Sequence, residues 1–171
     1  MEQLTQLSDW LRIQPQHTVA VHQSRTVSSA ELVQKIDGWM AALSPHSGSR
    51  WAAYHTDACE FLAILLALWQ LKRTACVPGD NCQGTVRRLS NHVDGFVGEF
   101  PDSGINCVAE PVNRAINFEW SVTAPDFVAL EIYTSGSTGE PKPITKTIAQ
   151  LDKEVQVLES LWPSCPGSVV L

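Results

Sequence analysis

The residues with the clearest chemical potential lie in segment 134–142, which reads TSGSTGEPK and follows the β-rich stretch Phe127–Tyr133. Its first six residues are all glycine, serine or threonine. Small side chains let a backbone turn tightly and point its N–H groups outward, which makes a concave cradle for an anion. Four hydroxyls add further donors, and Lys142 adds a positive charge three residues after Gly139. A polyphosphate needs many donors at once, so the pattern predicts a phosphate-binding loop.

This segment differs from the common P-loop, which places four residues between its first glycine and a Gly-Lys-Ser/Thr ending. Here two residues separate Gly136 from Gly139, and Pro143 follows the lysine. Two plainer interpretations therefore remain open. The segment could be only a linker, or its glycines could serve a tight hairpin. Regular elements are predicted on both sides of it, which favours a functional loop over a linker.

Strand-like and helix-like segments alternate along the chain, which predicts an α/β fold. Helices are indicated by apolar residues at helical spacing, and strands by β-rich stretches that turn residues bound. The predicted helices are 29–43, 58–71 and 148–162, with a weaker one at 83–92, and the predicted strands are 19–21, 26–27, 50–55, 74–78, 95–100, 105–108, 127–133 and 144–147. The helix at 58–71 is apolar on nearly all sides, so it is expected to be buried.

Several local patterns give sharper expectations. A residue pair that caps a helix start consists of a hydroxyl or carboxylate followed three positions later by Glu or Gln. The predicted capping pairs are Ser28 with Glu31, Asp57 with Glu60, and Thr147 with Gln150. Residues 101–104, PDSG, are predicted to form the turn between the strands on either side. Glu131 is expected to be either a solvated edge residue or a partner for Lys142 or Lys146.

Composition excludes several classes. With 12 Lys and Arg against 18 Asp and Glu the net charge is −6, which disfavours binding to nucleic acid or to an anionic membrane. The longest apolar run, 61–69, is far shorter than the about twenty residues of a membrane span, and no signal peptide is seen. The five cysteines and five histidines lack zinc or redox spacing, so no metal site and a cytoplasmic protein are predicted.

Segment 133–142, YTSGSTGEPK, resembles the signature phosphate-binding loop of the adenylate-forming (AMP-binding) enzymes, which include acyl-CoA synthetases, luciferases and peptide-synthetase adenylation domains. Other stretches of the chain also resemble segments of these enzymes, and they occur in the same order. Residues 26–43 resemble an early helix of these enzymes, residues 58–80 the following helix and strand with a proline-containing loop, and residues 124–133 the lead-in to the signature. The resemblance covers about 26–147 and implies an α/β fold, the N-terminal subdomain of such an enzyme, with a mixed β-sheet flanked by helices.

The resemblance also implies a function. These enzymes use ATP and Mg²⁺ to convert a carboxylic acid into an acyl-adenylate and pyrophosphate, and a thiol of CoA or of an acyl carrier protein then takes the acyl group. The chain is thus expected to be part of an acid–thiol ligase of the acyl-CoA synthetase kind, acting on a fatty or aryl acid. The resemblance assigns ATP binding to Thr134, Ser135, Gly136, Ser137, Thr138, Gly139 and Lys142. It assigns no catalytic residue and no metal ligand within the chain.

Two departures from the family pattern matter. Pro143 stands where a glycine is usual, and because proline lacks an N–H, the start of the strand there is expected to lie on a sheet edge or outside the hydrogen-bonded ladder. The later family motifs are also missing, including the magnesium-site, adenine-binding and ribose-binding segments and the C-terminal catalytic lysine. We therefore expect residues 1–171 to be the N-terminal part of the adenylation domain, inactive alone, without the C-terminal domain. Two alternatives remain: a self-standing nucleotide- or phosphate-binding module, and a non-enzymatic scaffold of the same fold.

Overall fold

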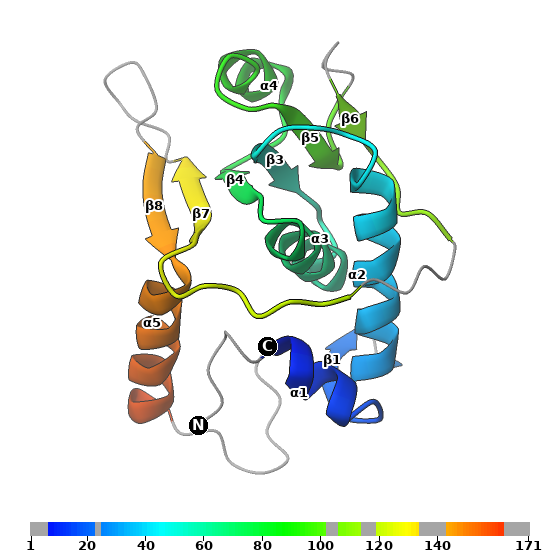
Figure 1. Cartoon of the computed structure of the whole chain (residues 1–171). Coiled ribbons are helices and arrows are strands. Elements are labelled where there is room, and N and C mark those ends of the chain that lie inside the picture. The colour runs from blue at the N-terminus through cyan, green and yellow to red at the C-terminus, as the bar shows by residue number, and fades with distance from the viewer. Residues whose placement is uncertain (1–6, 23–24, 102–105, 114–118, 134–142, 163–171) are drawn as a thin grey trace.

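The computed structural model describes residues 7–22, 25–101, 106–113, 119–133 and 143–162. Helices and strands alternate along most of this chain (Figure 1), as the sequence predicts for an α/β protein. The helices are α1 (Leu7–Ile13), α2 (Ser29–Leu43), α3 (Ala58–Gln70), α4 (Gln83–Leu89) and α5 (Ile148–Leu161). The strands are β1 (Thr18–His22), β2 (Arg25–Ser28), β3 (Arg50–Tyr54), β4 (Thr74–Pro78), β5 (Gly95–Gly98), β6 (Cys107–Val108), β7 (Val128–Tyr133) and β8 (Pro143–Thr147).

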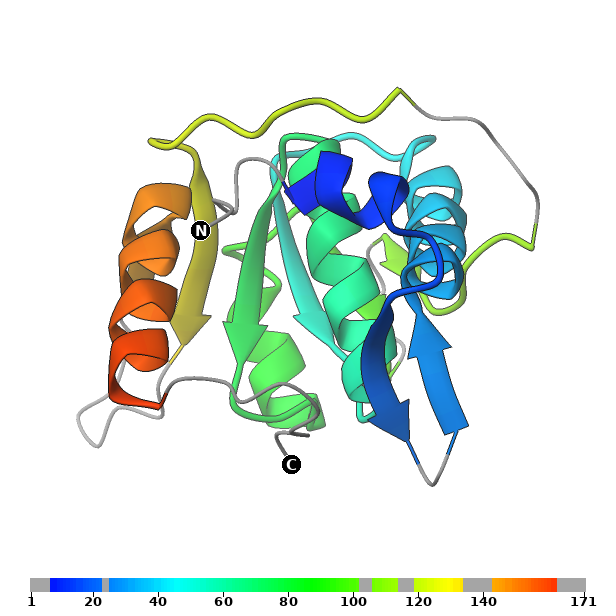
Figure 2. The ribbon, with the colours of Figure 1, turned by 90° about the horizontal axis from the view of Figure 1, so that it is seen from below.

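The main sheet has six strands in the order β6-β5-β3-β4-β7-β8. Every neighbouring pair is parallel except β7 and β8, which are antiparallel, so the sheet is mixed as expected. The chain passes from β3 to β4 and then returns to the other side of β3 as β5. This reversal is a topological switch point between β3 and β4, the place where open α/β sheets usually bind ligands. A separate hairpin, β1-β2, lies beside α2 (Figure 2).

Two capping boxes predicted from the sequence are confirmed. At the start of α2, Ser28 Oγ accepts from the Glu31 amide while the Glu31 carboxylate accepts from the Ser28 amide, at 3.2 and 2.8 Å. Thr147 and Gln150 make the equivalent pair of bonds at the start of α5. These contacts satisfy amides that would otherwise lack a partner, which fixes where each helix begins.

Helices cover both faces of the sheet. On one face α2 and α3 pack over inward residues of the strands, including Trp51, Ala53 and Ala75, and α3 contributes seven buried residues. The prediction that this apolar helix is buried is therefore confirmed. On the opposite face α4 places Val86 and Leu89 over a second, smaller cluster of strand residues. The alternation of strand side chains between the two faces accounts for the two separate cores.

The strands on either side of the turn predicted at 101–104 pair with each other in parallel, as β5 and β6. Parallel neighbours need a connection that returns the chain to the starting edge of the sheet. Residues 102–105 lie outside the described ranges, so the turn itself stays a prediction. The paired strands are also shorter than predicted, four residues in β5 and two in β6.

Helix α5 differs from the other long helices in its environment. Its predicted apolar face exists, since Ile148 is buried and Leu151 is half-buried. Towards the end of the helix, however, Leu158 is 53% exposed and Trp162 is 71% exposed. Among the described residues, α5 contacts chiefly β8, and it stands beside the sheet edge with its outer side open (Figure 1).

Candidate functional site

The predicted loop begins at one particular edge of the sheet. Strands β3, β4, β5 and β7 are parallel, so their carboxyl ends lie together. The next residues in the chain are His55, Gly79, Glu99 and Thr134. Loops at this edge surround the switch point between β3 and β4, which makes it the candidate site on topology alone.

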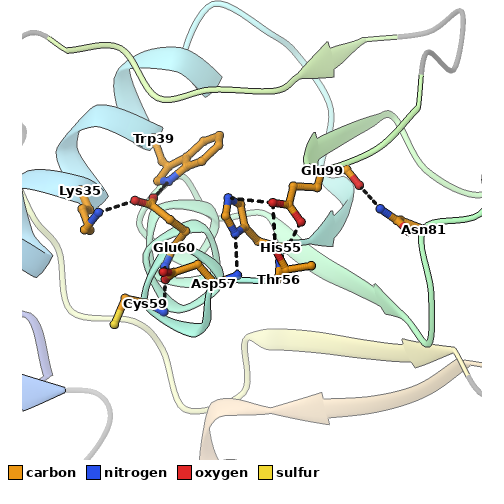
Figure 3. Close-up of polar contacts among 9 residues, drawn as sticks. All are labelled: Lys35, Trp39, His55, Thr56, Asp57, Cys59, Glu60, Asn81 and Glu99. Atoms are coloured by element: carbon orange, nitrogen blue, oxygen red, sulfur yellow. Dashed lines mark hydrogen bonds and ion pairs between the residues drawn. The ribbon is translucent and has the colours of Figure 1, made fainter. Parts of the chain in front are cut away.

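The loops after β3 and β5 are joined by a carboxylate (Figure 3). Glu99 accepts hydrogen bonds from the amide and the hydroxyl of Thr56, at 2.9 and 3.0 Å. Both bonds lower the pKa of the Glu99 carboxyl, and the bond from the hydroxyl has the larger effect. Nε2 of His55 lies 3.8 Å from the same carboxylate, and its Nδ1 accepts from the Asp57 amide at 3.0 Å. An imidazole that accepts at Nδ1 carries its proton on Nε2, so that N–H faces Glu99.

The loop after β4 is tied to the same place. The side-chain amide of Asn81 donates to the Glu99 carbonyl oxygen at 2.5 Å (Figure 3). One residue earlier, the Asp80 carboxylate accepts from the Cys82 amide at 3.1 Å. Hydrogen bonds from the side chains of Cys82 and Thr85 and from that amide lower the pKa of Asp80 to about 2. Three loops at the carboxyl edge are thus held in one arrangement by hydrogen bonds.

The start of α3 corrects one prediction. Asp57 caps the helix, because its carboxylate accepts from the amides of Cys59 and Glu60 at 2.8 and 3.0 Å. The Glu60 side chain does not complete a capping box. It accepts from the buried Trp39 indole at 2.9 Å and pairs with the Lys35 ammonium, which ties α3 to α2 (Figure 3). A buried indole N–H needs an acceptor, and that need outweighs the local bond expected from spacing.

The predicted ATP-binding residues, 134–139 and Lys142, lie outside the described residues, so their roles stay predictions. The strands that flank them are described. Strands β7 and β8 pair in antiparallel register, with Tyr133 opposite Pro143, so segment 134–142 joins the ends of a paired hairpin. Strand β8 is the edge strand of the sheet, which confirms the expectation drawn from Pro143.

Glu131 corrects part of a second prediction. It is not a solvated edge residue, because β7 lies between β4 and β8 and the Glu131 side chain is 13% exposed. Its partner is Arg50 at 2.5 Å, on strand β3. Lys146, one of the two partners expected, pairs instead with Glu154 on α5. The other, Lys142, lies outside the described residues. No sequence pattern pointed to Arg50, since the two residues are 81 positions apart.

Sequence reasoning also missed His55, Glu99 and Asn81. One signal was present: each lies within three residues of the end of a predicted strand, and the structure shows these strands to be parallel. The carboxyl ends of such strands meet at one edge, so polar residues at those positions are candidates to lie together. Within the described parts of the chain, no group of three or more His, Cys, Asp or Glu is arranged to hold a metal ion, and no helix is long and apolar enough to cross a membrane.

Comparison with solved structures gives clear matches. MenE of Bacillus subtilis, an o-succinylbenzoate CoA synthetase in complex with its acyl-adenylate intermediate, superimposes with a TM-score of 0.78 at 16% identity over 96% of this chain and 47% of that chain. The N-terminal subdomain of Klebsiella oxytoca NpsA gives a TM-score of 0.67 at 17% identity over 86% of this chain and 42% of that chain. The fold is that of the N-terminal part of adenylate-forming enzymes.

The R195K variant of Escherichia coli MenE, with bound OSB-AMS, gives a TM-score of 0.74 at 16% identity over 93% of this chain and 37% of that chain. The chain therefore spans less than half the length of each of these three structures. No protein-family model and no curated protein sequence matches it. The comparisons thus bear on the fold, and the sequence pattern of 133–142 bears separately on the chemistry.

Proposed function

We propose that the chain supplies the N-terminal, phosphate-binding part of an ATP-dependent carboxylate-activating ligase. In this reaction a carboxylate oxygen attacks the α-phosphorus of ATP, the bond to the β-phosphate oxygen breaks, and acyl-adenylate and pyrophosphate form. A thiolate of CoA or of a carrier-protein arm then attacks the acyl carbon and AMP leaves. The acid itself is of the fatty or aryl class.

Within this chain, the proposed work falls to segment 134–142. Its backbone amides and the hydroxyls of Thr134, Ser135, Ser137 and Thr138 would hold the β- and γ-phosphates, and Lys142 would offset their charge. Mg²⁺, when bound with the nucleotide, supplies further neutralisation of the phosphates. Catalysis of such a step consists mostly of positioning and of stabilising the negative charge that develops on pyrophosphate.

One observation carries the proposal: the signature-like segment leaves the sheet at the carboxyl end of parallel strand β7. That edge is where α/β sheets bind ligands. The loops that carry His55, Asn81 and Glu99 lie at the same edge and are linked by hydrogen bonds, so a ligand there would contact an ordered surface. The likeness in fold to MenE of Bacillus subtilis, a CoA synthetase in complex with its acyl-adenylate intermediate, supports the same interpretation.

The test is ATP–pyrophosphate exchange by the complete polypeptide that the gene encodes, assayed over a panel of fatty and aryl acids. Lys142→Ala and Gly136→Val should each lower exchange about 10²-fold or more, the effect of losing a charge-stabilising donor. Lys153→Ala is the matched control, because Lys153 is an exposed residue of α5 and loses the same charge. Full exchange in both loop variants would contradict the proposed role of the segment.

A second measurement separates the proposal from a self-standing nucleotide-binding module. The 171-residue chain contains no segment that resembles the adenine- or ribose-binding motifs of the family, so we expect weak ATP binding or none by calorimetry. Micromolar affinity would favour the binding module instead. Exchange that is absent with every acid, together with a loop that tolerates any substitution, would favour the scaffold.

A further inference from the structure

Four polar side chains from three strands converge on the α4 face of the sheet. Arg50 comes from β3, Cys76 from β4, and Glu131 and Tyr133 from β7. Arg50 Nη2 donates to Glu131 Oε2 at 2.5 Å and to the Tyr133 hydroxyl at 2.9 Å. The Tyr133 hydroxyl lies 3.3 Å from Glu131 Oε2 and donates to it. We call Arg50, Glu131 and Tyr133 the strand-end triad.

The register of the strands explains how the triad forms. Ala52 is opposite Cys76, and Cys76 is opposite Glu131, so all three side chains emerge on the same face. Arg50 lies two residues before Ala52 on β3, so its side chain emerges on this face as well. Ala52 and Cys76 are both small, which lets the long arginine side chain cross β4 to reach β7. The Cys76 thiol donates a further hydrogen bond to the Glu131 carboxylate, at 3.4 Å.

The triad is held more firmly than a surface ion pair. The Glu131 carboxylate is largely buried, and the Tyr133 ring packs in the core beneath α4 with Val86 and Leu89. Burial, followed by the nearby Cys76, raises the pKa of Tyr133 to about 12, so the phenol stays protonated and can donate. Removing one member would leave each of the other two, a partly buried charge or hydroxyl, without one of its partners.

Tyr133 is also the last residue of β7 and directly precedes segment 134–142. It is fixed twice, at its ring by the core and at its hydroxyl by Arg50, while its backbone pairs with Pro78 and Pro143. From this geometry we infer that Arg50 is a positioning residue for the phosphate-binding loop, acting through Glu131 and Tyr133 on the strand end from which the loop begins. This inference rests on the proposed function.

The alternative is that the triad only stabilises the sheet. The two roles differ in what they change below the unfolding temperature. A purely stabilising triad leaves the loop of the folded protein unchanged, so the KM for ATP stays the same. A positioning triad determines where the strand ends and the loop begins, so its loss raises the KM for ATP in protein that is still folded.

The experiment compares Tyr133→Phe, Arg50→Met and Arg50→Lys in ATP–pyrophosphate exchange by the complete polypeptide. We expect the KM for ATP to rise about 10-fold in Tyr133→Phe, which loses the hydrogen bonds of the hydroxyl with Arg50 and with Glu131. Arg50→Lys keeps the charge and should recover part of the affinity that Arg50→Met loses. The control is Glu154→Gln, which breaks the Lys146 ion pair on the neighbouring strand and should leave the KM unchanged.

Hydrogen–deuterium exchange of the peptide that contains 134–142 provides a readout that needs no activity. In Tyr133→Phe its amides should exchange faster than in the wild type, and in Glu154→Gln they should not. Wild-type protein without pyrophosphate exchange would defeat the proposed function, and the amide measurement would still decide the role of the triad. An unchanged KM and unchanged amide exchange in Tyr133→Phe would overturn the inference.

Discussion

Gly98, at the end of β5, is the position where the smallest change should have the largest effect on folding. Its φ is +94°, in the region that L side chains rarely adopt. A Cβ placed there would lie 2.1 Å from the Tyr54 carbonyl oxygen, a backbone atom that cannot swing aside. The same carbonyl accepts the Glu99 amide at 2.8 Å, so Gly98 allows the close approach that brings Glu99 to Thr56.

The cost of Gly98→Ala can be worked from these two terms. The left-handed backbone costs an L residue about 1–2 kcal/mol. Forcing β5 away from β3 adds about 1–3 kcal/mol, as for an overpacked core. Together these predict a loss of about 2–5 kcal/mol in the free energy of unfolding. For a chain of this size, the melting temperature should fall by about 5–15 °C, measured by circular dichroism.

The matched control is Gly79→Ala, at the same edge of the sheet. Apart from its chain neighbours, no heavy atom of the described residues lies within 4 Å of the position its Cβ would take, and its φ is outside the left-handed region. Its stability should change by no more than about 0.5 kcal/mol, as for an unconstrained surface site. If Gly98→Ala melted within 2 °C of the wild type, roughly the size of a 1 kcal/mol effect, the reasoning about the β3–β5 approach would be refuted.

Glu60→Leu should lower the free energy of unfolding in urea by about 1–3 kcal/mol, because the buried Trp39 indole loses its acceptor, whereas Glu60→Gln keeps an oxygen and should cost less; equal losses would contradict this. The pKa of Asp80 is lowered from 3.8 to about 2, so its contribution to stability is present above pH 4 and is lost as the pH falls towards 2. Asp80→Asn should flatten that part of the acid-unfolding curve, and a carboxyl NMR titration midpoint near 4 would refute the assignment. Iodoacetamide should label exposed Cys82 in the native protein but not Cys76, which is buried and whose pKa burial raises to about 12. Equal labelling of the two cysteines by mass spectrometry would contradict this prediction.

Local patterns predicted the fold best. The capping boxes at Ser28 and Thr147 were found because both partners lie within one helical turn, where spacing alone decides the contact. The same pattern at Asp57 gave a wrong role for Glu60, because Trp39 and Lys35 from another helix compete for its carboxylate. Pairing of β5 with β6 was missed for a related reason, since a turn sequence says nothing of which strand lies alongside.

In the candidate site too, local features could be predicted from the sequence and long-range contacts could not. The edge position of β8 followed from Pro143, because the missing N–H of proline acts at its own position. The partner of Glu131 could not be found from the sequence, because Arg50 reaches it across another strand. Long-range polar contacts of this kind depend on strand order, which periodicity does not specify. The roles of Thr134 to Gly139 and of Lys142 stay predictions.

Helix α5 has a consequence for how the chain opens. Of its described residues only Ile148, at the first turn, is buried, so tertiary packing supports one end of the helix and little else. A 14-residue helix with so little packing is marginal in water. Its backbone hydrogen bonds should therefore break progressively from Leu161 back towards the capped first turn, while β8 stays paired. The helix should therefore fray from its C-terminal end, and the free energy of local opening should decrease with distance from the sheet.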